Sequence, residues 1–338
     1  MKAVKLDKPW EVVLREIDEP IPGIGEALIK IKAAGICGSD IGAYRGKNNL
    51  VSYPRIIGHE LAGEVISIPD NANGIKPGDR VVIDPYRYCG ECYPCSIGRT
   101  NCCSALKVLG VHIDGGMAEL FTHPADMLIK LPENIPWELA PLAEPLTIAL
   151  HGLHRLRLIA GEHIAIFGAG TIGLLASMAA LHYQAIPIVI DLVPQRLAIA
   201  KELGAKHTIN IKEQNLVETI SKITQGRMCE CVMEASGAQS AIRSSLDIVS
   251  YAGRIALTGW PETETSLPTD IITKKEIDIR GARNSAGEFA EALELISSGA
   301  VNVKAILTDT VPISDAATAL IDIEKHPEKY LKVVAAFK

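Results

Sequence analysis

Hydrophobic and polar residues alternate in short runs over roughly the first 135 positions of the chain. Residues 27–33 (ALIKIKA) alternate as a strand with one buried face does. Residues 61–68 (LAGEVISI) and 80–84 (RVVID) predict two more strands, and the turn Pro77-Gly78-Asp79 precedes the second of them. Glycine and proline are frequent between these runs. This part of the chain is therefore predicted to be all-β.

The pattern changes near residue 140, where short apolar runs begin to alternate with helical segments. A long apolar helix follows a glycine-rich turn and continues through Leu181, and a second helix spans residues 194–203 and ends at Gly204. Strand and helix in alternation predict βαβ units around a parallel sheet. After about residue 285 the pattern is helical and then mixed. The predicted parallel strands lie at residues 164–167, 186–190, 231–235 and 254–258, and a further strand is predicted at residues 276–279.

We therefore predict an α/β protein that joins a β-rich domain to a doubly wound parallel-sheet domain. Its 338 residues suit two domains of about 150 residues each. The parallel-sheet domain is predicted to span residues 146–285. Residues 1–145 and 286–338 together form the predicted β-rich domain.

Composition narrows the range of partners. Hydrophobic residues make up 48% and charged residues 22%, which is typical of a folded globular protein, and the formal net charge of -6 argues against a nucleic-acid partner. The sequence contains no uncharged apolar run of about 18 residues, and Met1–Lys8 lacks the basic head and apolar stretch of a secretory signal. We expect no membrane partner and a cytoplasmic location. The eight cysteines are too few for a disulfide scaffold, and their clustering favours metal binding.

Gly168, Gly170 and Gly173 form a G-x-G-x-x-G motif between a predicted strand and a predicted helix. The first glycine permits a tight turn, the second lets backbone approach a pyrophosphate, and the third lets the helix pack closely on the strand. Asp191 ends the next strand, where its carboxylate accepts hydrogen bonds from ribose hydroxyls and repels a 2′-phosphate, so NAD is favoured over NADP. A glycine-rich turn without a ligand is the alternative. The residues predicted to contact NAD are Gly168, Gly170, Thr171, Ile172, Gly173, Asp191 and Arg196.

Cys89, Cys92, Cys95 and Cys103 offer four thiolates in one loop. Four sulfurs complete the tetrahedral shell of zinc and leave no open position, so we predict a structural zinc site. Cys102 is interpreted as a free thiol, because neighbouring side chains do not normally point the same way. An iron–sulfur cluster is the alternative.

Cys37, His59 and Glu144 are far apart in the sequence but offer a second ligand set. A thiolate, an imidazole and a carboxylate suit a catalytic zinc with an open position. Each residue alone has a simpler interpretation: a small core side chain, a core histidine and a helix cap. Their occurrence together with the dinucleotide motif favours the metal.

These residues lie in motifs that resemble those of the zinc-dependent medium-chain dehydrogenases over essentially the whole chain. The resemblance implies a GroES-like catalytic domain, a Rossmann domain that binds NAD, and a homodimer or homotetramer. The context Glu144-Pro145-Leu146 looks like the sorbitol and polyol dehydrogenase branch. That branch implies zinc bound by Cys37, His59 and Glu144, with Glu60 able to exchange with the zinc water or bind through it. The shared motifs are Gly35-Ile36-Cys37-Gly38-Ser39-Asp40, Gly58-His59-Glu60, Lys76-Pro77-Gly78-Asp79-Arg80-Val81, the four-cysteine loop and residues 168–173.

The same resemblance implies a proton relay near the catalytic zinc. Asp40 would fix the ring of His59, and Ser39 would pass a proton towards solvent. Many relatives carry a histidine at the outer end of the relay, where this chain has Gly42. Water, the cofactor ribose, Tyr44 and His112 are the candidates to replace it.

Shorter stretches resemble bacterial sugar-acid dehydrogenases of the L-galactonate and L-gulonate 5-dehydrogenase group. They are Tyr53-Pro54-Arg55 and residues 98–103, 110–116 and 281–284. In the implied reaction zinc acts as a Lewis acid on a secondary hydroxyl, and hydride passes to the nicotinamide. Arg283 is the candidate for gripping a substrate carboxylate, with a surface arginine or an inter-domain ion pair as the alternative.

Other activities stay open at this level. Polyol oxidation of the sorbitol, L-iditol or galactitol type and L-threonine 3-dehydrogenation are alternatives that use the same metal and cofactor. A crystallin-like or regulatory relative without turnover fits less well, because Cys37, His59 and Glu144 are all present. A zinc-free quinone-reductase relative would lack the four-cysteine loop, which is intact here.

Overall fold

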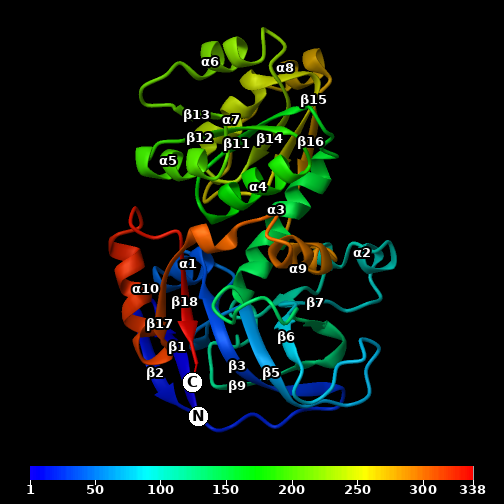
Figure 1. Cartoon of the computed structure of the whole chain (residues 1–338), viewed down its shortest axis with the longest axis vertical. Coiled ribbons are helices and arrows are strands. Elements are labelled where there is room, and N and C mark those ends of the chain that lie inside the picture. The colour runs from blue at the N-terminus through cyan, green and yellow to red at the C-terminus, as the bar shows by residue number, and fades with distance from the viewer. Residues whose placement is uncertain (338) are drawn as a thin grey trace. The chain divides into compact units, whose positions relative to one another are not determined.

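The structure is a computed structural model and describes residues 1–337. It consists of two compact units (Figure 1). The first comprises Met1–Glu144, Phe289–Ser297 and residues 303–337, and the second comprises Pro145–Glu288 and Ser298–Asn302.

A seven-stranded sheet forms the centre of the first unit. Its strand order is β10-β6-β5-β3-β18-β17, and β9 also pairs with β3. A three-stranded sheet, β2-β1-β4, and a two-stranded ribbon, β7-β8, accompany it. The strands are β1 (Lys2–Lys8), β2 (Glu11–Glu16), β3 (Glu26–Ile36), β4 (Arg55–Ile56), β5 (Glu60–Ser67), β6 (Arg80–Ile83), β7 (Tyr86–Arg87), β8 (Lys107–Val108), β9 (Leu120–Pro124), β10 (Leu128–Lys130), β17 (Leu307–Pro312) and β18 (Lys332–Ala336). The helices are α1 (Gly38–Tyr44), α2 (Tyr93–Ser96), α9 (Phe289–Ser297) and α10 (Ala316–Lys325), with short 3-10 turns η1 (Thr100–Cys102), η2 (Ala125–Met127), η3 (Ala140–Leu142), η4 (Val303–Ile306) and η5 (Ile313–Asp315).

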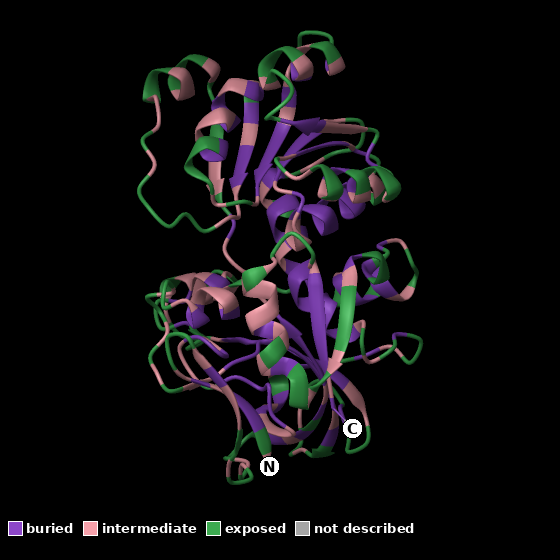
Figure 2. Ribbon diagram, turned by 90° about the vertical axis from the view of Figure 1, so that its left-hand side faces the viewer, coloured by how far each residue is buried: buried purple, intermediate pink, exposed green. Residues whose placement is uncertain are grey.

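The alternation along β3 builds the core of this unit. Ile29 and Ile31 are buried, while Lys30 between them is exposed. They join Leu6 and Leu61 in one hydrophobic cluster. Figure 2 shows the buried parts of the strands of this unit in purple. Burying each such side chain is worth about 1.5–3 kcal/mol, and a slip of one residue would turn the whole apolar set outward. The hydrophobic pattern therefore fixes the strand register.

That register brings three chain segments to one place. β18 pairs with β3 so that Val333 faces the last residue of β3, and β5 pairs with β3 so that Glu60 faces Gly35. The end of β3, the start of β5 and the start of β18 therefore lie side by side. Cys37, Glu60 and Lys332 meet there.

The prediction of an all-β amino-terminal part is wrong at α1. Cys37 is the N-cap of this helix, and the carboxylate of Asp40 accepts the backbone N–H of Cys37 at 2.8 Å. This reciprocal cap satisfies amides that a short helix otherwise leaves unpaired. Gly38 and Gly42 lower the local helix propensity, so the sequence pattern alone indicates a loop.

Six parallel strands form the sheet of the second unit. The predicted parallel sheet with interleaved helices is confirmed. The strand order β13-β12-β11-β14-β15-β16 reverses direction between β11 and β14, which is a topological switch point. The strands are β11 (His163–Phe167), β12 (Ile186–Asp191), β13 (His207–Asn210), β14 (Cys229–Glu234), β15 (Val249–Leu257) and β16 (Asp278–Gly281). The helices are α3 (Ala143–Leu156), of which Ala143 and Glu144 belong to the first unit, α4 (Thr171–His182), α5 (Pro194–Glu202), α6 (Leu216–Ile223), α7 (Gln239–Ile248) and α8 (Thr269–Lys275).

Strand β16 begins later than the sequence suggested. A strand was expected to begin at Glu276, but that residue ends α8 with a left-handed backbone, φ 52°. A left-handed residue stops a helix and cannot continue a sheet ladder. The paired strand therefore starts at Asp278.

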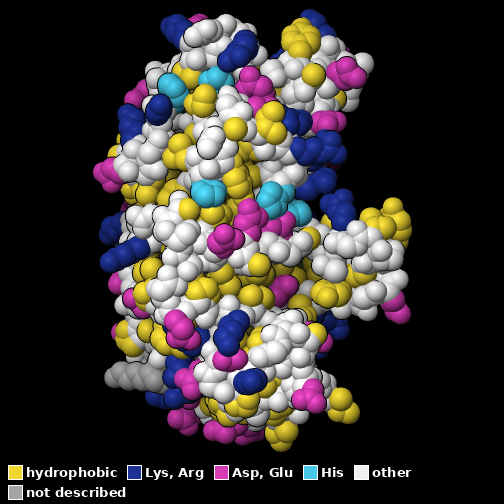
Figure 3. All heavy atoms as spheres, turned by 45° about the vertical axis from the view of Figure 1, so that its right-hand side comes forward, with side chains coloured by type: hydrophobic (Ala, Val, Ile, Leu, Met, Phe, Trp, Pro, Cys, Tyr) yellow, Lys and Arg dark blue, Asp and Glu magenta, His cyan; other side chains and the backbone are white. Residues whose placement is uncertain are grey.

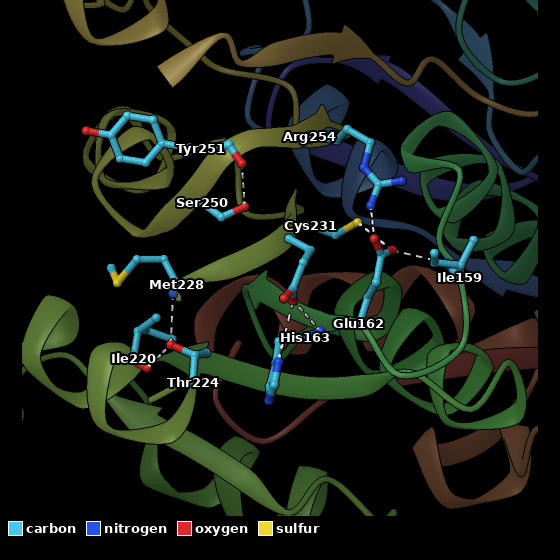
Figure 4. A network of polar contacts seen from close by, with 11 residues as sticks. Ile159, Glu162, His163, Ile220, Thr224, Met228, Cys231, Ser250, Tyr251 and Arg254 are labelled. Atoms are coloured by element: carbon cyan, nitrogen blue, oxygen red, sulfur yellow. Dashed lines mark hydrogen bonds and ion pairs between the residues drawn. The ribbon is translucent and has the colours of Figure 1, made fainter. Parts of the chain in front are cut away.

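A polar network crosses the second unit between β11, β14 and β15 (Figure 4). Glu162 accepts hydrogen bonds from the guanidinium of Arg254, from the backbone N–H of Ile159 at 3.1 Å and from the thiol of Cys231 at 3.5 Å. Cys231 is fully buried, and burial raises the pKa of its thiol. A buried neutral thiol is unreactive, so this network is structural.

Both signs of charge are present on the surface. Lysine and arginine side chains are interspersed with aspartate and glutamate on the face shown in Figure 3, in keeping with the small net charge of -6. None of the helices formed by the described residues combines the length and the apolar character needed to span a bilayer.

Candidate active site and metal centres

Cys37, His59 and Glu60 come together where β3 ends and β5 begins. One ligand atom from each lies within 4.8 Å of the others. His59 and Glu60 are buried and Cys37 is half-buried. Gly35 has to lack a side chain, because a Cβ there would lie 1.9 Å from Oε2 of Glu60. A thiolate, an imidazole and a carboxylate in this space fit a zinc ion with an open coordination position.

Lys332 is a residue of this site that the sequence did not reveal. It is the first residue of β18 and only 4% exposed. Its Nζ lies 2.5 and 2.8 Å from the two carboxylate oxygens of Glu60 and donates to the carbonyl oxygen of Ile36 at 3.2 Å. Burial lowers the pKa of Lys332, but the charges of Glu60 and Cys37 outweigh burial and raise it. The ammonium group therefore compensates part of the negative charge of the site.

Asp40 lies behind His59. Its Oδ1 is 4.0 Å from Nδ1 of His59, which is an ion-pair distance rather than a hydrogen bond, and its Oδ2 holds the amide of Cys37. Burial lowers the pKa of His59, but Cys37, Asp40 and Glu144 outweigh it and raise that pKa well above its usual value. The site thus favours a positive charge on or beside the imidazole. A divalent cation satisfies the same demand.

Glu144 reaches the site from the first turn of α3. It is 2% exposed, and one of its oxygens accepts a hydrogen bond from the hydroxyl of Tyr86. Burial raises the pKa of Glu144 to about 7, which a nearby cation would reverse. Glu144 is not part of the group of three residues whose ligand atoms all lie within 4.8 Å of one another. Its role as a zinc ligand therefore stays a prediction. The sequence alone did not predict Tyr86 as a site residue, because it lies 58 positions from Glu144 along the chain.

The predicted relay residues differ in their surroundings. Oγ of Ser39 is buried and has no hydrogen-bond partner within residues 1–337. At Gly42 a Cβ would meet nothing closer than 3.9 Å, so this position tolerates at least a methyl group. The ring of Tyr44 packs in the core with its centroid 5.2 Å from that of Trp10, and Nδ1 of His112 accepts a backbone N–H at 3.1 Å. Ser39 thus places a buried hydroxyl without a hydrogen-bond partner two residues after Cys37, and its part in a proton relay stays a prediction.

Four cysteines form the second candidate metal centre. The sulfurs of Cys89, Cys92, Cys95 and Cys103 lie 3.4 to 4.0 Å from one another across four of their pairs. Tetrahedral zinc with Zn–S bonds of about 2.3 Å places its sulfurs about 3.8 Å apart. Backbone N–H groups of Cys95 and Ser104 lower the pKa of the Cys92 thiol to about 6, which favours a thiolate. These four sulfurs therefore fit a closed zinc site, and Cys102 is not one of them.

Replacing Cys92 with serine is expected to remove one zinc and open the loop. Three sulfurs bind zinc less tightly than four, and the loop depends on the metal because only a small apolar cluster packs beneath it. Elemental analysis should fall from about two zinc ions per chain to about one. Limited proteolysis should then cut between residues 89 and 103.

Cys102→Ser is the matched control for this experiment. It changes the neighbouring thiol but leaves the four clustered sulfurs in place. It should keep both zinc ions and resist proteolysis like the unmodified protein. Loss of zinc in Cys102→Ser and its retention in Cys92→Ser would contradict the assignment.

The glycine motif opens α4 at the switch point of the second unit. Gly168 has φ 94°, in the left-handed region, and a Cβ on Gly173 would lie 1.8 Å from the carbonyl oxygen of Gly168. Gly170 is the N-cap, and a Cβ there would meet nothing within 4 Å. Thr171 and Ile172 are the first helical residues, so their N–H groups are at the positive end of the helix. This open space in front of a helix amino terminus fits a pyrophosphate.

Asp191 ties this loop to the end of β12. Its Oδ2 accepts the N–H of Ala169 at 2.6 Å, and its Oδ1 accepts the N–H groups of Leu192 and Val193 at 2.7 and 2.9 Å. A carboxylate has about four acceptor positions, so capacity remains for a ribose hydroxyl. Arg196 lies in the first turn of α5, the helix that follows.

Arg283 lies in the turn that follows β16 and is half-buried. The turn is anchored on α3 within the second unit. The carbonyl oxygen of Gly281 accepts Nε of Arg155 at 3.0 Å, and Glu288 contacts Nδ1 of His151 at 2.7 Å. Asn284 beside Arg283 has φ 51°, a conformation that asparagine tolerates better than most residues.

The sequence matches two described families in turn. Residues 23–133 match the alcohol dehydrogenase GroES-like domain, and residues 171–298 match the zinc-binding dehydrogenases. The chain belongs to the zinc-binding alcohol dehydrogenase family. An uncharacterized zinc-type alcohol dehydrogenase-like protein of Haemophilus influenzae is 54% identical over 338 residues, which are 100% of this chain and 99% of that protein.

Other members of the family have more specific names. Sorbitol dehydrogenase of Bacillus subtilis is 35% identical and aligns with 99% of this chain and 96% of its own. L-galactonate-5-dehydrogenase of Escherichia coli is 32% identical, with coverages of 94% and 93%. A crystal structure of the alcohol dehydrogenase RspB from Escherichia coli CFT073, complexed with NADH, has a TM-score of 0.94 and 34% identity and covers 100% of this chain and 99% of that one. The predicted dehydrogenase class, the GroES-like and Rossmann domains, and the zinc and nicotinamide dinucleotide cofactors are confirmed.

Proposed function

We propose that this dehydrogenase oxidises a secondary hydroxyl of a six-carbon sugar acid to a ketone and passes hydride to NAD. The supporting observation is the charge around the predicted zinc ligands. Cys37, Glu60 and Glu144 bring three negative charges, which the two charges of zinc and the one of Lys332 offset. The metal centre then has no surplus positive charge to attract an anion. A carboxylate on the substrate needs a separate cation.

Arg283 is proposed as that cation. A guanidinium group binds a carboxylate through two parallel hydrogen bonds, which fixes orientation as well as charge. The likeness to L-galactonate-5-dehydrogenase supports a sugar acid. The likeness to sorbitol dehydrogenase supports the second candidate, a neutral polyol.

Each residue of the site has a proposed task in this reaction. When bound, zinc supplies a Lewis acid that lowers the pKa of the substrate hydroxyl, and the nicotinamide accepts the hydride. Cys37, His59 and Glu144 are the proposed ligands, and Lys332 holds Glu60 beside them. The buried Oγ of Ser39 is the proposed first acceptor of the hydroxyl proton.

Arg283→Ala is expected to raise KM for L-galactonate or L-gulonate roughly 10- to 150-fold, because a charge-assisted pair in a partly dry site is worth about 1.5–3 kcal/mol. KM for sorbitol should change less than about twofold, because a neutral polyol has no carboxylate that could pair with Arg283. NAD-coupled absorbance over hexonates, polyols, L-threonine and simple secondary alcohols measures both effects.

Arg243→Ala is the control for that comparison. Arg243 pairs with Asp247 on α7 in a half-buried i,i+4 pair, and its replacement should not change KM for any substrate. The sugar-acid proposal is wrong if a polyol or L-threonine is turned over faster than the hexonates, or if Arg283→Ala changes KM equally for all substrates. Only the family assignment would then stand.

NAD is expected to be preferred over NADP roughly 100-fold in kcat/KM, because the carboxylate of Asp191 would stand near the added phosphate. Three backbone N–H groups fix that carboxylate in place. Asp191→Gly should narrow the preference to less than about tenfold, whereas Asp270→Gly, at an exposed acid on α8, should not alter it. Equal kcat/KM for both cofactors in the unmodified enzyme would refute the role of Asp191.

We also propose that the enzyme is a homodimer or homotetramer in the cytoplasm. The family resemblance supports the assembly. The eight cysteines support a reducing compartment, because none forms a disulfide among the described residues. Light scattering after size-exclusion chromatography tests the assembly.

A further inference from the structure

Glu234 ends β14, beside the strand that leads into the glycine motif (Figure 1). The strand order reverses between β11 and β14, and open parallel sheets bind their ligands at the carboxyl ends of such strands. The backbone N–H of Ala235 donates to the carbonyl oxygen of Phe167, and a Cβ on Gly168 would lie 3.3 Å from Cβ of Ser236. The loop after Glu234 therefore packs directly against the glycine motif, at the edge of the sheet where such folds bind their ligands.

The side chain of Glu234 is completely buried, and donors surround its carboxylate. It accepts the N–H of Ser236 at 2.8 Å, the hydroxyl of Ser236 at 2.5 Å and the N–H of Gly237 at 3.0 and 3.1 Å. A Cβ on Gly259 would lie 2.7 Å from its Oε2, so the next loop also closes around it. Glu234 is the acceptor in each of these hydrogen bonds, which suits an ionised carboxylate because that form only accepts.

This buried charge has no cationic partner. Among residues 1–337, no lysine, arginine or histidine lies within ion-pair distance of Glu234. Two other buried glutamates do have a basic partner: Glu60 pairs with Lys332, and Glu288 pairs with His151. Buried charges in proteins are normally paired or coordinate an ion, because an uncompensated one is costly. The site therefore lacks one positive charge.

We propose that Glu234 is a charge-compensating residue for the positively charged nicotinamide ring of the oxidised cofactor. This rests on the proposed function, because it assumes that a nicotinamide dinucleotide binds at the switch point between β11 and β14. The ring loses its charge when it takes up a hydride, which carries two electrons and one proton. Glu234 then strengthens binding of NAD⁺ relative to NADH, and it biases the equilibrium on the enzyme towards reduction of the ketone.

The measurement is the ratio of the Kd for NAD⁺ to the Kd for NADH, determined by fluorescence titration and equilibrium dialysis without substrate. Two unit charges about 10 Å apart, at an effective dielectric constant of about 20 to 40, change such a ratio roughly 4- to 16-fold. Glu234→Gln should raise the ratio by that factor, mainly by weakening NAD⁺. Ser236→Lys should raise it in the same direction, because a lysine at this exposed position neutralises the carboxylate without removing it.

Two controls separate charge from loop geometry. Ser236→Ala removes the same hydroxyl as Ser236→Lys but adds no charge, and Glu234→Asp keeps the charge on a shorter side chain, so both should keep the ratio within about twofold of the unmodified enzyme. If Glu234→Gln weakens both forms equally and Ser236→Lys leaves the ratio unchanged, Glu234 only shapes the loop and the proposal is wrong. If the unmodified enzyme binds neither form, the proposed cofactor site is wrong instead.

Discussion

Replacement of His59 with alanine is expected to lower turnover at least about 1,000-fold while the first unit stays folded. His59 supplies the imidazole in the group with Cys37 and Glu60, and no other histidine joins that group among the described residues. Lewis-acid catalysis contributes several kcal/mol, and each 1.4 kcal/mol is about a factor of ten in rate. Zinc content should fall from about two ions per chain to about one, because the four-cysteine site is separate. NAD-coupled absorbance, elemental analysis and circular dichroism measure the three outcomes.

His123 provides a buried histidine of the opposite kind as a control. It is fully buried and stacks on Phe121, and its Nε2 contacts the backbone oxygen of Asp84 at 2.8 Å. Burial lowers the pKa of His123 to about 3, so it is a neutral core residue. His123→Gln should lower stability but keep both zinc ions and most of the turnover. If both histidine variants lose activity only through unfolding, His59 is structural.

Local spacing explains why the four-cysteine loop and the glycine motif could be predicted from the sequence, whereas Cys37, His59 and Glu144 were linked only by their occurrence together and by the family resemblance. The four clustered cysteines fall between Cys89 and Cys103, and the three glycines fall between Gly168 and Gly173. Donors that are close in sequence converge at a small cost in loop entropy, and the chemistry of the ligand then follows from the donor type. Glu234 shows the limit of this reasoning. Its role depends on the absence of a cation, which only the folded structure reveals.

Long-range pairing explains what the sequence did not reveal. Lys332 is 272 residues from Glu60 and starts an apolar strand, where a lysine would ordinarily be expected to face solvent. Its position follows from the register of β18 on β3 and of β3 on β5, and strand register over such separations leaves no local mark. The helix α1 was not predicted for a different reason. Its cap is formed by residues close in sequence, but its glycines lower the helix propensity so that the segment looks like a loop.

Lys332→Met is expected to destabilise the zinc-free protein by about 3–5 kcal/mol, which is the usual cost of removing one partner from a buried ion pair. The substitution leaves Glu60 with its charge, no exposed surface and no neighbouring ammonium. Urea unfolding followed by tryptophan fluorescence reports mainly on this unit, because Trp10 and Trp137 lie in it and Trp260 of the second unit is already exposed in the folded protein. The loss should be smaller in zinc-loaded protein, since the ion supplies positive charge close to the same carboxylate.

The double variant Glu60→Gln with Lys332→Met decides whether the charge pair causes this loss. Removing both charges leaves no uncompensated ion, so the double variant should be more stable than Lys332→Met alone, and the two changes should not add. Lys332→Arg keeps a positive charge and should retain much of the stability, and Lys329→Met, at an exposed position near the same strand, should cost less than about 0.5 kcal/mol. Additive losses in the double variant would mean that Lys332 contributes only packing. A non-additive result assigns to Lys332 the task of compensating the buried carboxylate of Glu60.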